Sequence, residues 1–198
     1  MKRPFVSLLA LCAFVAAGIL AAPAVTVVPD AGVVKVKKVE FPRKVQLDDR
    51  TLEVRGKGLL EWWTVDVYSA AFYLPEEVPS SPQSFLGEEA AYLLIHYHRG
   101  IDAEDFIEAT KKSLEKNPNT PWDELQPQLE KLYDMFEDVE KGDRYCIATF
   151  PDGRTEIRLN DELRGTFQGE EFASAFLGIW VSEYPLNKSF RDKLLGRR

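Results

Sequence analysis

The fold is decided by the stretch GKGLLEWWTVDVYSAAFYL, residues 56–74. Its β-branched and aromatic side chains alternate with small or polar ones, which is typical of β-strands in a sheet. Gly56 and Gly58 indicate a bend in the chain, and Pro75 follows the last apolar residue and ends the strand. The stretch therefore predicts two long strands, over residues 51–59 and 62–74.

Patterns on both sides of this stretch extend the sheet and add helices. Alternating residues predict more strands, whereas apolar residues three and four positions apart predict helices. Further strands are expected at 33–41, 44–47 and 90–99, with a hairpin of 145–150 and 155–160, and helices at 102–117, from Trp122 onward, at 168–181 and at 187–195. Strands with helices inserted among them indicate an α+β fold with a mainly antiparallel sheet.

Composition excludes several classes of protein. The 198 residues are enough for one domain, and 45% of them are hydrophobic. The 25 Lys and Arg residues are outnumbered by 32 Asp and Glu, which gives a net charge of −7 and argues against a non-specific nucleic-acid binder. Two cysteines and two histidines cannot build a cysteine-rich zinc module or a disulfide scaffold.

The N-terminus has the layout of a secretory signal peptide. Two basic residues precede an apolar run over 5–21, and Ala22-Pro23-Ala24 supplies the small residues of a cleavage site. We expect residues 1–24 to be removed, residues 25–38 to form a linker and leading strand, and the mature protein to be periplasmic or secreted. Membrane contact is then limited to the signal peptide before cleavage. The alternative is that the apolar run stays as a membrane anchor.

No set of residues forms a recognisable catalytic or metal site. His96 and His98 project from one face of a strand, but a metal site needs a third and usually a fourth ligand, so ordinary sheet histidines are the favoured interpretation. Cys146 lies on an apolar strand, where a buried, inert thiol is expected. The sequence has no phosphate-binding or nucleophile-elbow motif. We therefore assign no catalytic residue, no metal and no cofactor.

Several stretches, taken in order, resemble the chalcone isomerase-like family. They are residues 56–74, the strand-to-helix segment 99–106, Lys141-Gly142-Asp143 with the hairpin that follows, and the closing segments from Phe172 to Gly196. The resemblance runs from about residue 39 to the end, which implies one chalcone isomerase-like domain over 39–198. It implies an open-faced β-sandwich, a large antiparallel sheet with helices packed on one side and a ligand cleft between them. The family's plant enzymes cyclise chalcones without metal or cofactor, and related non-enzymatic members bind fatty acids in this cleft.

The resemblance also implies which positions line that cleft. The family's arginine, which steadies an anionic group, corresponds to Leu60, and its active-site tyrosine corresponds to Phe106. Neither replacement can donate a hydrogen bond, so chalcone cyclisation is not expected. The other candidate ligand-binding residues are Tyr68 at the threonine position, Phe72, Tyr97 near the lysine position, Arg99 as a substitute cation, and Ser113 near the asparagine position.

The sequence therefore predicts an exported, non-catalytic protein that binds a lipophilic small molecule such as a fatty acid. Pockets lined by apolar and aromatic residues bind such molecules with few polar contacts. One alternative is an isomerase or intramolecular lyase that uses Tyr68 on an unknown substrate. Another is an interaction module that docks a protein partner through the 122–138 helix. The sequence leaves open whether the aromatic positions line a cleft or simply fill the core.

Overall fold

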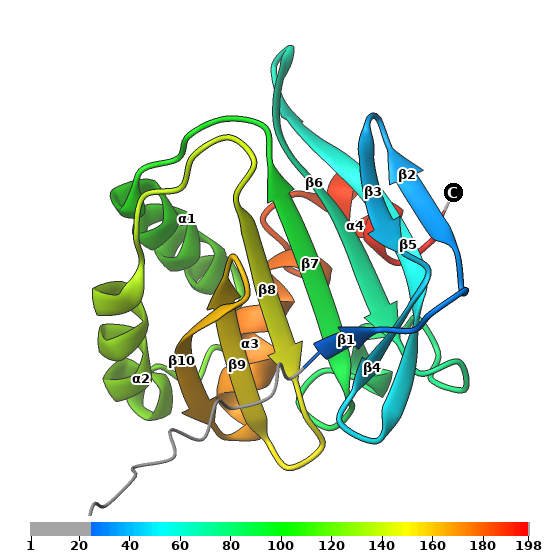
Figure 1. Ribbon diagram of the computed structural model, residues 1–198. Coiled ribbons are helices and arrows are strands. Elements are labelled where there is room, and N and C mark those ends of the chain that lie inside the picture. The colour runs from blue at the N-terminus through cyan, green and yellow to red at the C-terminus, as the bar shows by residue number, and fades with distance from the viewer. Residues whose placement is uncertain (1–24, 198) are drawn as a thin grey trace, which may run out of the picture.

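The computed structural model describes residues 25–197 (Figure 1). The signal-peptide prediction falls on residues 1–24 and so lies outside the described residues. None of the helices in the described part is long and apolar enough to cross a bilayer. The elements are β1 (Val25–Val27), β2 (Val33–Val36), β3 (Val39–Pro42), β4 (Lys44–Leu47), β5 (Arg50–Trp62), β6 (Val65–Leu74), a 3₁₀ turn (Pro82–Ser84), β7 (Ala91–Tyr97), α1 (Ala103–Lys116), α2 (Trp122–Met135), β8 (Arg144–Thr149), β9 (Arg154–Leu159), β10 (Glu162–Gln168), α3 (Glu170–Val181) and α4 (Lys188–Leu194).

Eight strands form one antiparallel sheet in the order β1-β4-β5-β6-β7-β8-β9-β10. The strands from β4 onward follow chain order, so hairpins and the β7–β8 excursion through α1 and α2 build almost the whole sheet. The four α-helices lie on one side of it (Figure 1). This confirms the predicted α+β fold and the open-faced arrangement.

Strand alternation sends apolar side chains to both faces of the sheet. The helix-facing side forms the main core, with residues such as Phe72, Leu93 and Ile147 almost completely buried against the helices. The opposite face has a second, smaller core, in which Phe41 of β3 packs with Tyr73 and other side chains of the sheet. The β2–β3 hairpin pairs only with itself and contributes to covering that face.

Three details of the predicted elements were wrong. The expected strand over 33–41 is a hairpin of two strands, because the chain turns between β2 and β3 at Lys37, which has a positive φ of 52°. The expected linker begins with β1, whose backbone pairs with β4. β10 was missed and continues the sheet beyond β9, with a register shift between Leu163 and Gly165 that breaks its alternation.

The expected bend at Gly56 and Gly58 does not end a strand, because β5 continues to Trp62. The two glycines serve a close contact instead. A Cβ at Gly56 would lie 2.2 Å from the backbone oxygen of Lys193, and one at Gly58 would lie 2.9 Å from the Lys193 Cβ. Only glycine therefore lets α4 dock this closely on β5.

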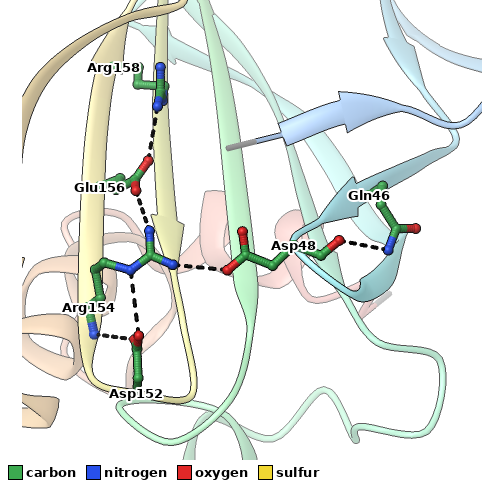
Figure 2. Close-up of polar contacts among 6 residues, drawn as sticks. All are labelled: Gln46, Asp48, Asp152, Arg154, Glu156 and Arg158. Atoms are coloured by element: carbon green, nitrogen blue, oxygen red, sulfur yellow. Dashed lines mark hydrogen bonds and ion pairs between the residues drawn. The ribbon is translucent and has the colours of Figure 1, made fainter. Parts of the chain in front are cut away.

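The side of the sheet opposite the helices is called the open face. On this face a chain of charged groups connects the β4–β5 turn to β9 (Figure 2). The Arg154 guanidinium donates to Asp48 Oδ2 at 2.9 Å and also contacts Asp152 and Glu156. Arg158 Nη2 donates to the second Glu156 oxygen at 3.1 Å. Glu156 is only 8% exposed, so two arginines hold one nearly buried carboxylate.

Candidate functional site

Four aromatic side chains meet between the sheet and the start of α1. Tyr68 of β6 and Tyr97 of β7 face each other across neighbouring strands, with ring centroids 5.6 Å apart. Phe106 of α1 lies 5.8 Å from the Tyr97 ring and 5.6 Å from that of Tyr145 on β8. We call these four residues the aromatic cluster. Its edge-on contacts are the geometry that aromatic rings favour.

The Tyr68 hydroxyl is a polar group within the aromatic cluster, and it forms a hydrogen bond with a helix. The Trp180 Nε1–H of α3 donates to the Tyr68 hydroxyl oxygen at 3.2 Å. Phe190 of α4 packs edge-on against the Tyr68 ring at 5.4 Å. Because the Tyr68 oxygen accepts from the indole, its own O–H stays available as a donor to a third group. Three elements far apart in sequence thus fix this hydroxyl.

The three phenols of the cluster are neutral hydrogen-bond donors rather than bases. Burial raises the pKa values of Tyr68 and Tyr97 above the usual value for tyrosine. Burial also raises the pKa of Tyr145 to about 12. All three therefore keep their protons at neutral pH. A phenol in that state can donate to a ligand oxygen, but it is a poor acceptor of a substrate proton.

The position that carries an arginine in the enzymes of the resembled family contributes only hydrocarbon. Leu60 lies opposite Tyr68 in the β5–β6 register and is half-buried against the main core. The structure thus brings Leu60, Tyr68, Tyr97 and Phe106 together at one end of the interface. Tyr68 and Tyr97 belong to the main core, and Leu60 and Phe106 pack against it.

Three other candidate residues lie apart from the aromatic cluster. Phe72 is fully buried further along β6, where it packs against Phe85 at 5.4 Å. Arg99 is exposed after β7, and its side chain donates to the backbone oxygen of Gly100 at 3.4 Å. Ser113 is buried on α1, near the other end of that helix.

Ser113 lines a hollow that sequence reasoning missed. It has a volume of about 360 Å³ and lies between α1 and α3, next to the loop at Leu86. Its walls include Asn117, Ser174 and the carboxylate-bearing Glu170, so they are more polar than the sheet–helix interface. No residue of the aromatic cluster lines it. Ser113 therefore belongs to a different surface from Tyr68 and Tyr97.

The two histidines lie on the open face of the sheet. Their rings are 5.5 Å apart, and among residues 25–197 no third metal-binding side chain joins them. His98 Nε2 shares a 2.8 Å hydrogen bond with Ser69 Oγ. The pKa of His96 is lowered by burial and by the nearby positive charges of Arg144 and His98. Ser69 has no solvent exposure, so this serine–histidine pair cannot meet a substrate in this conformation.

Cys146 should be chemically inert in the folded protein. It is buried on the open face, as expected, and burial raises its pKa to about 11. At pH 8 only about one thiol in a thousand is then ionised, and the thiolate is the reactive form. We expect iodoacetamide to label the Cys146 peptide slowly in buffer and at least tenfold faster in urea, as measured by mass spectrometry. Equal rates in the two conditions would contradict the buried placement.

Sequence reasoning missed two residues of the site. Tyr145 could have been placed by the alternation of β8, which sends it and Ile147 to the helix-facing side. Trp180 lies on the expected 168–181 helix, but its bond to Tyr68, 112 positions away, has no signal in the sequence.

Comparisons with known proteins agree with this architecture. A family model described as chalcone isomerase-like matches residues 33–196. Among solved structures, a fatty-acid binding protein of Arabidopsis thaliana is similar in fold, with a TM-score of 0.59 over 86% of this chain and 95% of that one, at 16% sequence identity. No curated protein matches the chain. Because the family model covers most of the chain, this protein belongs to the chalcone isomerase-like family.

Proposed function

We propose that this protein binds a lipophilic small molecule, such as a fatty acid, between the sheet and the helices, and that it catalyses no reaction on it. The observation that carries the proposal is the aromatic cluster, where apolar rings surround neutral hydroxyls and the family's arginine position is Leu60. A site of this kind favours hydrocarbon and offers few polar contacts. The similar Arabidopsis protein, described as fatty-acid binding, supports the same class of ligand.

In this proposal the ligand takes the place of side chains that now fill the interface. Phe106 is the ring most suited to move, because it is half-buried and stands on the first turns of α1. Its displacement would uncover the Tyr97 and Tyr145 rings that it contacts. A hydrocarbon chain then replaces aromatic contacts with contacts of the same kind, so the cost of opening is largely recovered.

The polar end of the ligand is assigned to Tyr68. Its hydroxyl accepts from Trp180 and can donate to one ligand oxygen. Leu60, which lies beside it, cannot offset the charge of a carboxylate. We therefore expect a fatty alcohol to bind at least as tightly as the fatty acid of the same chain length. The catalytic alternative is not favoured, because the neutral phenols offer no base for a proton transfer.

Leu60→Arg should raise the affinity for fatty acids about tenfold or more. A charge-assisted hydrogen bond to a carboxylate contributes roughly 1.5–3 kcal/mol, and the half-buried position lets the guanidinium reach the aromatic cluster while its stem packs on the core. Displacement of a fluorescent fatty acid measures the change. Leu60→Met is the matched control, since it keeps an apolar side chain of similar volume.

The fatty alcohol of equal chain length separates charge from hydrocarbon. The affinity for this alcohol should be the same in wild type and in Leu60→Arg.

Native mass spectrometry of the wild-type protein from its own host, before and after organic extraction, tests the proposal without assuming a ligand. A bare mass, together with no displaceable binding in wild type and in Leu60→Arg, would refute it and favour an interaction module.

We also propose that the protein acts in the cell envelope after cleavage at Ala24. The basic start, apolar run and small-residue exit of residues 1–24 support this. The intact mass of the protein from an envelope fraction tests it. A mass that includes residues 1–24 would instead support the retained anchor.

A further inference from the structure

The connection between β5 and β6 exposes two tryptophans. Figure 1 shows this hairpin projecting past the ends of the neighbouring strands. Trp62 is 71% exposed, Trp63 is 90% exposed and Val65 is 46% exposed. We call residues 62–65 the tryptophan tip. Large apolar side chains that gather on a surface in this way mark a site of interaction.

The backbone holds the tip out rather than folding it back. Glu61 pairs with Asp66 and Trp62 with Val65, so β5 and β6 continue to pair with each other almost to the turn. On the other side of β6, pairing with β7 starts only at Tyr68. Trp63 turns the chain with a φ of 59°, a left-handed conformation that is uncommon for a bulky residue. A strained turn that presents an indole to solvent indicates a use for that indole.

The charges near the tip favour contact with a surface that carries no net charge. Residues 62–65 carry no charge. Below them, Lys37 binds Asp66 with its ammonium 2.6 Å from Oδ2, which offsets one of the two flanking carboxylates. Arg99 is exposed at the same end of the sheet, one residue beyond His98, whose N–H donates to Val67 at 2.9 Å. The net charge of −7 would repel an anionic surface.

The size and shape of the tip favour a bilayer over a protein partner. Two tryptophans can bury at most about 500 Å², whereas a stable protein interface buries about 800 Å² on each partner. The tip is also the end of a projecting two-stranded hairpin (Figure 1), so few other residues can add to its contact area. Tryptophan is enriched at membrane–water interfaces, where its amphipathic ring lies at the level of the headgroups. A few residues are enough for contact of that kind.

We propose that the tryptophan tip inserts into the interface of a zwitterionic lipid bilayer. The inference goes beyond the proposed function and holds whether or not the aromatic cluster binds a ligand. If both hold, insertion brings Leu60 and Tyr68 to the membrane, because they lie opposite each other on the strands just below the tip. A lipophilic molecule could then pass between bilayer and protein with little exposure to water.

Sedimentation with phosphatidylcholine vesicles tests the tip directly. The test compares wild type with the double variant Trp62→Ser, Trp63→Ser, and with Trp122→Ser as the matched control, since Trp122 is 42% exposed on α2. All three proteins carry the same N-terminus, so any contribution from residues 5–21 is common to them. We expect the double variant to lose about tenfold or more in vesicle partitioning, and Trp122→Ser to bind like wild type.

Two further readouts identify the mode of contact. Brominated lipids should quench the fluorescence of Trp122→Ser, and binding should change less than twofold in 0.5 M salt because it is not electrostatic.

Equal partitioning of wild type and the double variant would overturn the proposal. A result in which wild type does not bind vesicles and the double variant loses binding to a protein partner would also overturn it. Matching thermal unfolding of all three proteins shows that the substitutions act at the surface. Ligand-free protein is used throughout, so a failed lipid-cleft proposal leaves this test unaffected.

Discussion

Gly56→Ala is expected to destabilise the protein by about 3 kcal/mol or more. The new Cβ would lie 2.2 Å from the Lys193 carbonyl oxygen and 2.4 Å from that of Leu194. Both atoms belong to the backbone at the end of α4, so no side-chain rotation can relieve the clash. Either α4 moves off β5 or the strand distorts next to its register shift between Val54 and Gly56. Urea unfolding followed by circular dichroism measures the loss.

Gly58→Ala is the matched control for this substitution. Its nearest contacts are side-chain atoms, the Lys193 Cβ at 2.9 Å and the Phe190 ring at 3.3 Å. The overlap is smaller than at Gly56, so a small shift of α4 should limit the cost to about 1 kcal/mol. Equal costs for the two variants would show that α4 does not dock as described. Gly56→Ala should also weaken ligand binding, because Phe190 of α4 supports the Tyr68 ring.

Glu156→Ala is expected to cost about 3 kcal/mol of stability. The Glu156 side chain holds Arg154 through one oxygen and Arg158 through the other (Figure 2). The Arg158 side chain is only 14% exposed and that of Arg154 only 26%. Removing the carboxylate leaves the poorly solvated Arg158 without its salt-bridge partner, whereas Arg154 keeps Asp48 and Asp152. Breaking a buried pair in this way costs about 3–5 kcal/mol. The same urea titration measures it.

Two variants separate this effect from surface electrostatics. Glu156→Gln keeps an acceptor for one arginine and should cost less than Glu156→Ala. Glu162→Ala removes a carboxylate whose side chain is 73% exposed beside Arg164, and should change stability by less than about 0.5 kcal/mol. Because the Glu156 groups are largely shielded, 0.5 M salt should hardly change the loss. A loss that disappears in salt would contradict the buried placement.

Residue patterns were sufficient to predict most of the sheet and the helices. On β7 strand alternation places Leu93, Ile95 and Tyr97 on one face, and all three lie in the main core. The α1 helix, Ala103–Lys116, lies within the expected range 102–117. The Asp102 side chain makes no capping bond, and Asp138 Oδ1 instead accepts from the Ala103 N–H at 2.8 Å.

Local patterns failed where the backbone conformation depends on contacts with residues far away in the sequence. The glycines at 56 and 58 resemble a turn signal. They are needed instead for the close contact with α4, which follows about 130 positions later in the chain. The true turn at Trp63 and Thr64 carries no glycine or asparagine, although turns of this kind normally contain one. The prediction therefore placed Trp62 and Trp63 within a strand, and their exposure came only with the structure.

Residue types were enough to assign the side-chain chemistry of the candidate site. Alternation assigns Tyr68 to the same side of its strand as Phe72, and position 60 is leucine in any conformation. Tertiary structure alone decided which of these residues meet. The Trp180–Tyr68 bond, the packing of Phe106 on Tyr97 and Tyr145, and the distance of Ser113 from them depend on how helices lie on the sheet. Contacts of this kind follow from the packing of whole faces, and no local spacing encodes them.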